Sequence, residues 1–317
     1  MVSLKEIADA LLENDYFYIL THRYPDGDTL GSAAALLRAL NKMGKHAKIL
    51  CNDKIAEKFE YLFDCVKDED FSPKIIISVD VADLDLLGEK LSVYKDRIDI
   101  CIDHHESNSI LAKQCYVDPK AAATAEIIYD LIELLNVDID IPTASCIYTG
   151  ISTDTGCFKY SNTTSKTHKI AARLLDIGVD AYKINKVMFD TKSKARIGLE
   201  KLVMDTLEFA FDDRCALICI TSDMIEKSKV ADSEVEGFAS IPICIDGVLV
   251  GITIREKENG LYKVSVRTGK EIQANLICEH FGGGGHKAAA GCSIKGQLDE
   301  VKKKILSVCI DRIKESV

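Results

Sequence analysis

The sequence lacks the features of membrane and secreted proteins. It contains no run of about 18 apolar residues, the length that a membrane-spanning helix requires. Its N-terminal segment, MVSLKEIADALLENDYF, has the pattern of an amphipathic helix that includes acidic residues, and it does not have the pattern of a signal peptide. These absences predict a cytoplasmic protein with no membrane partner.

Paired cysteine motifs are also absent. The chain has 12 cysteines, but none of them form a CxxC pair. Most lie singly inside apolar segments, as Cys219 does in Leu217–Ile220 and Cys244 in Ile243–Ile245. We therefore interpret them as reduced, buried thiols that pack as small hydrophobic side chains.

Positive charge is in short supply. The 40 Lys and Arg residues are outnumbered by 50 Asp and Glu residues, which leaves a net charge of −10. Proteins that hold long nucleic acids usually carry a basic face, so we expect no long-duplex partner. A short anionic ligand, held by metal ions and a few cationic side chains, stays compatible with this charge. With 317 residues, 47% of them hydrophobic, the chain suits two soluble globular domains.

The first half of the sequence alternates strand and helix patterns. Strands are expected at residues 17–21, 46–51, 75–80 and 98–102, and helices at 3–13, 30–43, 56–63, 122–135 and 142–152. This alternation predicts an α/β fold with a mostly parallel sheet flanked by helices. In such sheets ligands bind beyond the carboxyl ends of the strands.

The pattern changes in the second half. A charged helical connector is expected at 191–212, followed by strands at 215–221, 241–245, 248–255 and 261–267 and helices at 274–281 and 299–314. Asp246–Gly247 and Glu258–Gly260 carry hairpin signals. We predict a first domain over 1–190 and a smaller α/β domain with a mixed sheet over 213–317, with a cleft between them.

Acidic and histidine residues gather where these elements end. The clusters are the segment His22–Asp28, then Asp80, then Asp103–His105, and finally Asp154. Each cluster alone could be an ordinary turn or helix cap. Together, carboxylates at the ends of buried strands repel one another unless positive charge lies among them.

A pair of divalent cations is the simplest source of that charge. Two imidazoles and four carboxylates are the set that two neighbouring metal ions need, with one carboxylate bridging. The candidate ligands are His22, Asp26, Asp28, Asp80, His104 and Asp154. Nitrogen and oxygen ligands without thiolates favour Mn²⁺, with Mg²⁺ or Co²⁺ as alternatives.

Residues 18–160 resemble the catalytic domain of the DHH phosphoesterase family. HRYPDGD, the strand that ends at Asp80, DHHESN and GISTDTGCFKYSNTT match its four motifs in order. The resemblance implies that His22 and Asp26 hold one metal ion, that Asp28, His104 and Asp154 hold the other, and that Asp80 bridges them. It also implies that Asp103 orients His104 and that His105 faces the substrate phosphate or the attacking water. The catalytic residues would then be Asp80, Asp103 and His105.

The second half resembles the DHH-associated domain of the same family. The segment FGGGGHKAAAG, Phe281–Gly291, is similar to its glycine-rich signature, in which backbone N–H groups can approach an anion closely. The resemblance implies substrate binding by Gly283, Gly284, Gly285 and His286, and by Arg267 at the end of an expected strand. The family more often has Ser after this arginine, where the present chain has Thr268.

The compact chain resembles the stand-alone bacterial oligoribonucleases of this family. That resemblance implies hydrolysis of short oligoribonucleotides and of the dinucleotide pApA to 5′-mononucleotides, and of 3′-phosphoadenosine 5′-phosphate (pAp) to AMP and phosphate. A cyclic di-AMP phosphodiesterase is the nearest alternative. A manganese pyrophosphatase would lack the GGGGH segment, and a nucleotide sensor without catalysis would lack metal ligands. A homodimer is left open.

Overall fold

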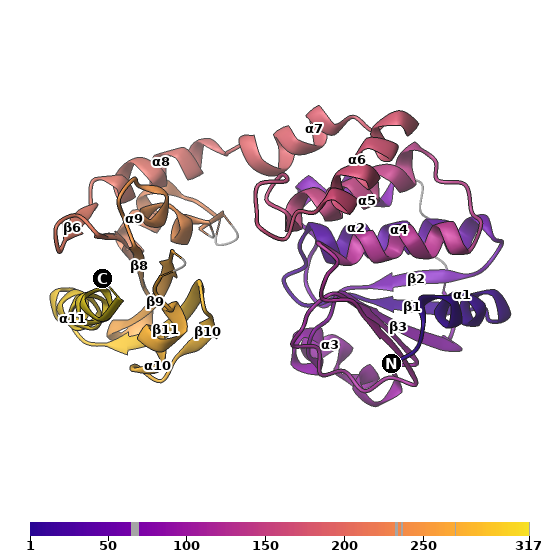
Figure 1. The fold of residues 1–317 in the computed structure, drawn as a ribbon, viewed down its shortest axis with the longest axis horizontal. Coiled ribbons are helices and arrows are strands. Elements are labelled where there is room, and N and C mark those ends of the chain that lie inside the picture. Colours follow the sequence, from indigo (N-terminus) through magenta and orange to yellow (C-terminus); the bar gives the residue numbers. More distant parts are fainter. Residues whose placement is uncertain (65–69, 232–233, 236, 270, 317) are drawn as a thin grey trace. The chain divides into compact units, whose positions relative to one another are not determined.

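The computed structural model describes residues 1–64, 70–231, 234, 235, 237–269 and 271–316. The chain divides into two compact units, Met1–Thr191 and Lys192–Val317, which are described separately (Figure 1). In the described parts of the chain, no helix combines the length and the apolar character that a membrane span requires.

The first unit alternates strands and helices. Its elements are α1 (Leu4–Glu13), β1 (Phe17–Leu20), α2 (Gly27–Lys42), β2 (Ala47–Leu50), η1 (Glu57–Phe63), β3 (Ile75–Val79), η2 (Leu84–Leu87), α3 (Gly88–Leu91), η3 (Ser92–Arg97), β4 (Ile100–Asp103), β5 (Gln114–Val117), α4 (Thr124–Leu134), α5 (Ile141–Asp154), α6 (Ser165–Ile177), α7 (Ala181–Asn185) and η4 (Lys186–Asp190). Here η marks 3₁₀ helices, except that η4 is a π-helical turn.

The sheet of this unit is parallel throughout its described strands. Their order is β2-β1-β3-β4-β5, and each neighbouring pair is parallel. Alternate residues of β1 enter different cores, because Phe17 and Ile19 pack with α1, α2, α4 and α5 while Tyr18 and Leu20 pack toward η2, α3 and η3. Figure 1 shows α2 and α4 on one face and α3 on the other. The expected helix-flanked parallel sheet is confirmed.

Helix α2 begins earlier than its apolar pattern indicates. The side chain of Asp26 accepts hydrogen bonds from the backbone N–H groups of Asp28 and Thr29, so it caps the helix and the first turn starts at Gly27. Asp28 is consequently a helical residue, and it is buried. Strand β5 and helix α6 were not expected from the sequence.

The second unit is built on a mixed sheet. Its elements are α8 (Lys194–Met204), β6 (Glu208–Ala210), β7 (Cys215–Ile220), α9 (Ser222–Ser228), η6 (Phe238–Ser240), η7 (Pro242–Cys244), β8 (Val250–Glu256), η8 (Glu258–Gly260), β9 (Leu261–Thr268), α10 (Ala274–Glu279), β10 (Gly284–His286), β11 (Ala289–Lys295) and α11 (Leu298–Ser316). The described strands follow the order β10-β11-β9-β8-β7-β6, in which only the β7–β8 pair is parallel.

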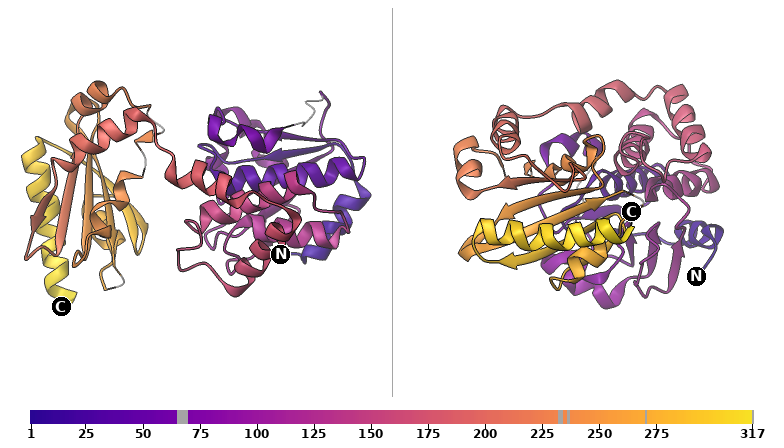
Figure 2. Two further views of the ribbon diagram at one scale, coloured as in Figure 1. Left: turned by 90° about the horizontal axis from the view of Figure 1, so that it is seen from above. Right: turned by 60° about the vertical axis from the view of Figure 1, so that its left-hand side comes forward.

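Both faces of this sheet carry helices. Val264, Val266 and Ile294 pack with residues of α10 and α11, and Figure 2 shows α11 lying along that face. On the other face, Leu199 and Val203 of α8 pack against Ile218 and Ile220 of β7. The segment 191–212, expected as a connector, therefore supplies α8 and β6 to the second unit.

The prediction of a strand at residues 241–245 is wrong. This segment forms the 3₁₀ turn η7, in which Pro242 has no N–H to give to a strand ladder. It crosses over β8 so closely that a Cβ on Gly251 would lie 2.5 Å from the backbone nitrogen of Ile243. The hairpin expected at Asp246–Gly247 is absent as well, because the segment before it forms no strand that could pair with β8. The hairpin at Glu258–Gly260 is confirmed, since it joins the antiparallel strands β8 and β9.

Close packing of α2 on α5 gives the first prediction. A Cβ on Gly31 of α2 would lie 2.4 Å from the carbonyl oxygen of Cys146 in α5. Because backbone cannot yield as a flexible side chain can, Gly31→Ala should destabilise the first unit by about 1–3 kcal/mol.

Thermal unfolding of the full chain measures this effect. Gly198→Ala in α8 is the matched control, because a Cβ there meets nothing within 4 Å. That change should raise stability by about 0.5–1 kcal/mol through helix propensity. A Gly31→Ala protein as stable as the parent would contradict the packing argument.

Candidate metal centre

Three neighbouring strands bring the predicted ligands to one edge of the sheet. His22 follows β1 by two residues, Asp80 comes directly after β3, and Asp103 is the last residue of β4 with His104 next. Strands β1, β3 and β4 are adjacent and parallel, so their carboxyl ends meet. The chain leaves β1 for β2 on one side and later returns to β3 on the other, which makes this edge a switch point where ligands bind.

The six predicted ligands form two groups. His22, Asp26 and Asp80 offer ligand atoms within 4.8 Å of one another, and so do Asp28, His104 and Asp154. In the first group, His22 Nε2 lies 3.7 Å from Asp26 Oδ1. In the second, His104 Nε2 lies 3.6 Å from Asp154 Oδ2 and 4.0 Å from Asp28 Oδ2. Each group has the size and the donor types to hold one cation.

Asp80 joins the two groups. Its Oδ2 lies 3.8 Å from Nε2 of His22, and its Oδ1 lies 3.8 Å from Nε2 of His104. One oxygen of a single carboxylate thus faces each group, which is the arrangement that a bridging ligand requires. The backbone of Asp80 has a φ of 59°, a left-handed conformation that is uncommon outside glycine and often found at functional sites.

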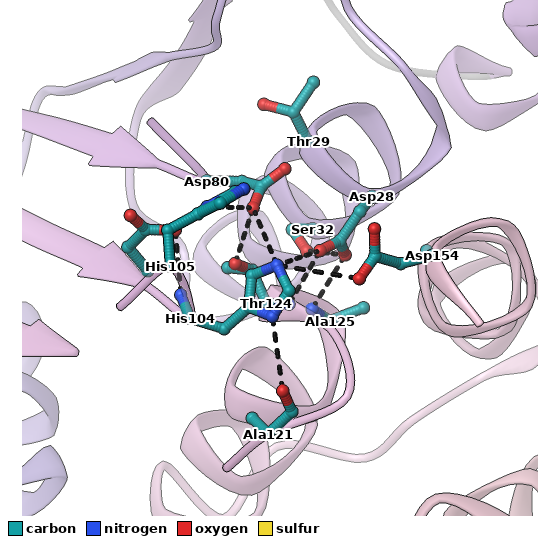
Figure 3. Close-up of polar contacts among 12 residues, drawn as sticks. Asp28, Thr29, Ser32, Asp80, His104, His105, Ala121, Thr124, Ala125 and Asp154 are labelled. Carbon is teal, nitrogen blue, oxygen red and sulfur yellow. Dashed lines mark hydrogen bonds and ion pairs between the residues drawn. The ribbon is translucent and has the colours of Figure 1, made fainter. Parts of the chain in front are cut away.

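The beginning of α4 holds two of these carboxylates. The N–H groups of Thr124 and Ala125 donate to Asp28, at 2.7 and 2.9 Å, and the hydroxyl of Thr124 donates to Asp80 Oδ1 at 2.8 Å (Figure 3). Ala123, at the N-cap, has no side chain that could do so. Sequence reasoning missed Thr124, although a Thr at the start of an expected helix was a signal.

Both imidazoles are oriented by backbone carbonyls. Nδ1 of His22 lies 2.8 Å from the carbonyl oxygen of Arg23, and Nδ1 of His104 lies 3.2 Å from that of Ala121 (Figure 3). Because Nδ1–H of each ring donates to a carbonyl, Nε2 carries the lone pair, and this nitrogen faces the carboxylates.

The contacts of Asp103 differ from those that the resemblance implied. Its Oδ1 accepts a hydrogen bond from Nδ1 of His105 at 2.8 Å, and its Oδ2 accepts one from Asn108 at 2.6 Å. It reaches His104 only through the backbone N–H of that residue, at 2.8 Å. Asp103 therefore orients the ring of His105, whereas Ala121 orients the ring of His104.

The electrostatics of the site favour bound cations. Burial, followed by repulsion from Asp28 and Asp26, raises the pKa of Asp80 well above its ordinary value and that of Asp154 to about 8. Burial also raises the pKa of Asp28. Asp154 is the last residue of α5, where the helix dipole disfavours a negative charge. Divalent cations would relieve each of these costs.

The donor set fits hard or borderline cations. Asp80, His104 and His105 form a third group of the same kind, and thiols take part in none of the three groups found among the described residues. Cys101 is buried beneath the site, and burial raises the pKa of its thiol to about 12. Imidazole and carboxylate ligands without thiolate suit Mn²⁺, Mg²⁺ or Co²⁺.

In the second unit, strand register brings Arg267 and His286 to one face. Arg267 of β9 pairs with Ala289 of β11, and Ala289 pairs with His286 of β10. Residues directly opposite one another in antiparallel strands point to the same side of the sheet. His286 is exposed and Arg267 is half-buried. The small side chain of Ala289 leaves space between them.

The glycine-rich segment packs more tightly than its sequence indicates. A Cβ on Gly283 would lie 2.3 Å from the carbonyl oxygen of Gly291, and one on Gly285 would lie 2.6 Å from that of Ala289. The N–H of Gly283 donates to Cys278. These glycines allow β10 to pair closely with β11, while Gly284 alone of the three predicted binding glycines has open space at its Cα.

Comparison with known proteins agrees with this geometry. The DHH family, N-terminal domain, matches residues 16–151, and the DHHA1 domain matches residues 218–315. The bifunctional oligoribonuclease and PAP phosphatase NrnA of Thermus thermophilus is 33% identical over 91% of this chain and 87% of that protein. The chain belongs to the DHH family.

Other DHH-family relatives differ in length and in likeness. The cyclic-di-AMP phosphodiesterase GdpP of Geobacillus thermodenitrificans is 24% identical, and this chain spans 46% of its length. An exopolyphosphatase-related protein from Bacteroides fragilis has a similar structure, with a TM-score of 0.87, 26% identity and coverage of 96% of this chain and 94% of that one. Exonuclease RecJ bound to manganese shares the fold, with a TM-score of 0.55, 14% identity and coverage of 98% and 95%.

The contact between Thr124 and Asp80 gives a second prediction. Thr124→Val keeps the shape of the side chain but removes the donor that fixes Asp80 Oδ1. We expect Mn²⁺ affinity to fall by about 10- to 100-fold, the usual cost of losing a group that orients a metal ligand. Isothermal titration of the metal-free protein measures it. Thr143→Val, in the first turn of α5, is a control that should leave the affinity unchanged.

The raised carboxyl pKa values give a third prediction. In cation-free protein the pKa of Asp154 is about 8, against an ordinary value of 3.8. Between these values the folded state binds more protons than the unfolded state, so stability falls as pH rises from about 4 to about 8. Mn²⁺ removes the repulsion, and should therefore raise the melting temperature more at pH 8 than at pH 5.5. Equal increases, each measured against chelator, would contradict the assignment.

Proposed function

We propose that this chain is a two-metal phosphoesterase that hydrolyses short oligoribonucleotides and pApA to 5′-mononucleotides and pAp to AMP and phosphate. The observation that carries the proposal is the position of Asp80, which offers one oxygen to each of two three-residue groups. The family membership and the name of the T. thermophilus relative support the substrate class. Both kinds of substrate present a phosphate ester that such a centre can hold.

The candidate ligands of the first unit would be shared between two cations. His22 and Asp26 would hold one cation, Asp28, His104 and Asp154 the other, and Asp80 both. Two cations there supply Lewis-acid activation of water and neutralise phosphate charge. We propose Mn²⁺, because the ligands are imidazole and carboxylate and because RecJ of the same fold binds manganese.

His105 is the side chain that we assign to the phosphate. The hydrogen bond to Asp103, together with the charges of Asp103, Asp154 and Asp28, raises the pKa of His105 against the opposing effect of burial. The imidazole is half-exposed and lies 3.6 Å from Asp80 through Nδ1. With Nδ1 bound to Asp103, a protonated ring has Nε2–H left to donate to a phosphate oxygen.

Arg267 and His286 would bind a phosphate of the substrate. Their shared face of the second sheet offers a guanidinium and an imidazole, separated by Ala289. A guanidinium suits a phosphate, because it donates two parallel hydrogen bonds. Gly284, with open space at its Cα, is the glycine of this segment that a ligand could approach. We propose the cytoplasm as the compartment, in line with the free cysteines of the described residues.

Cyclic di-AMP is the second candidate substrate. The same metal centre would serve it, and the resemblance to GdpP favours it, although GdpP is about twice as long as the stretch that this chain matches. A sensor without catalysis is disfavoured, because all six ligands are present and lie together.

A substrate panel tests the proposal. Protein with Mn²⁺ should release mononucleotide from pApA and short RNA and phosphate from pAp, and chelator should stop each reaction. Faster turnover of cyclic di-AMP than of pApA would favour the alternative. If none of these substrates released product, the proposal that the chain is a phosphoesterase would be refuted.

Asp80→Asn tests the metal assignment. The change keeps the size of the side chain and removes charge repulsion, so the fold should persist while activity falls more than about 100-fold. Asp85→Asn is the matched control, since Asp85 lies nearby in the chain and its side chain is 88% exposed. A well-folded Asp80→Asn protein with parental activity would show that the assignment is wrong.

A further inference from the structure

The loop between two candidate metal ligands carries two exposed side chains. Arg23 and Tyr24 stand between His22 and Asp26, and 76% of the surface of Tyr24 is exposed. Consecutive Cα atoms are about 3.8 Å apart, so the Cα of Tyr24 lies within about 8 Å of those of both ligands. A substrate held at this candidate centre is therefore close to the backbone from which the phenol ring extends.

Neighbouring loops hold the backbone of this pair in place. The N–H of Arg23 donates to the carbonyl oxygen of Leu86 at 2.6 Å. The N–H of Tyr24 donates to Oδ2 of Asp53 at 2.9 Å. Two separate segments of the first unit thus fix the direction in which Tyr24 leaves the loop.

The conformation that they fix is an unfavourable one. Tyr24 has a φ of 55°, in the left-handed region that bulky side chains rarely occupy. It also precedes Pro25, and residues before proline favour extended backbone instead. Such strain persists only where surrounding contacts impose it, and it gathers at ligand-binding sites.

The two side chains contact each other. The guanidinium of Arg23 lies over the Tyr24 ring, 5.6 Å from its centre. Tyr160, on the loop after Asp154, is different although it is also exposed. Its ring packs on Gly156, where a Cβ would lie 2.4 Å from it. Among the described residues no other aromatic ring packs on Tyr24, so its ring, with Arg23 over it, is an exposed aromatic surface beside the candidate metal centre.

We propose that the ring of Tyr24 is a stacking platform for a nucleobase of the substrate whose phosphate lies at the metal centre. This inference rests on the proposed function and adds a base-binding subsite to it. Every nucleobase offers a π-face to an aromatic ring, so stacking suits an enzyme that accepts many sequences. Arg23 adds positive charge beside the ring and so favours an anionic nucleotide.

A pair of substrates that differ only in the base tests this subsite. Tyr24→Ala should raise KM for pAp about tenfold or more, the usual effect of removing one base–aromatic contact. It should leave KM unchanged for 1-deoxyribose 3,5-bisphosphate, which has no base. Tyr24→Phe should behave as the parent on both. Tyr182→Ala is the matched control, because Tyr182 is 74% exposed and lies on α7, which carries no candidate ligand.

Fluorescence provides a direct readout of stacking. The 5′-monophosphate of 2-aminopurine riboside should be quenched on binding to the parent, and Tyr24→Ala should abolish that quenching while Mn²⁺ affinity stays at the parental value. Parental KM for pAp in Tyr24→Ala would overturn the proposal. So would an equal loss on both bisphosphates, or a loss of Mn²⁺ affinity, because Tyr24 would then only support its loop. A parent that cleaves neither bisphosphate, and neither pApA nor short RNA, would refute the proposed function instead, and quenching would still decide on the subsite.

Discussion

The hydrogen bonds at the beginning of α4 are the interaction on which the metal centre depends. The first N–H groups of a helix need acceptors, and Ala123 offers none from its side chain. Asp28, which comes from α2, accepts from Thr124 and Ala125 instead. The positive end of the helix stabilises a carboxylate that burial would otherwise neutralise. Capping of one helix and placement of a candidate metal ligand are thus the same contact.

This contact requires α2, α4 and α5 to approach closely, and glycine makes the approach possible. A Cβ on Gly150 of α5 would lie 2.8 Å from Oδ1 of Asp28 and 2.5 Å from the Cβ of Ala125. The same packing places Asp154, at the end of α5, beside His104. The acidic side chains therefore meet because the helices pack well, and their mutual repulsion is a cost that the rest of the core must offset.

The six candidate ligands, which the structure brings together, could be picked out from the sequence because each stands where an apolar run or a helix ends. That signal survives errors of a few residues in the boundaries. The contact between His104 and Ala121 could not be predicted from the sequence, because Ala121 acts through its backbone carbonyl and not through its side chain. The role of Asp103 was misassigned because rotamers, and not spacing, decide whether it meets the ring of His104 or that of His105. The strand predicted at residues 241–245 was wrong for a different reason. A short apolar run can pack over the face of a sheet as readily as it can form another strand of that sheet.

The two units differ in the charge of the side chains that they bring together. In the first, carboxylates and imidazoles without thiols form a candidate cation site among the described residues, where burial and mutual repulsion raise the pKa of Asp80. In the second, Arg267 and His286 come from strands that are separated in sequence but aligned through Ala289, and they supply positive charge and donors directly. Because Gly283 and Gly285 must remain glycine for steric reasons, the glycine signature keeps β10 in register with β11. That register, more than anion contact by the glycines, is what places His286 on the same face as Arg267.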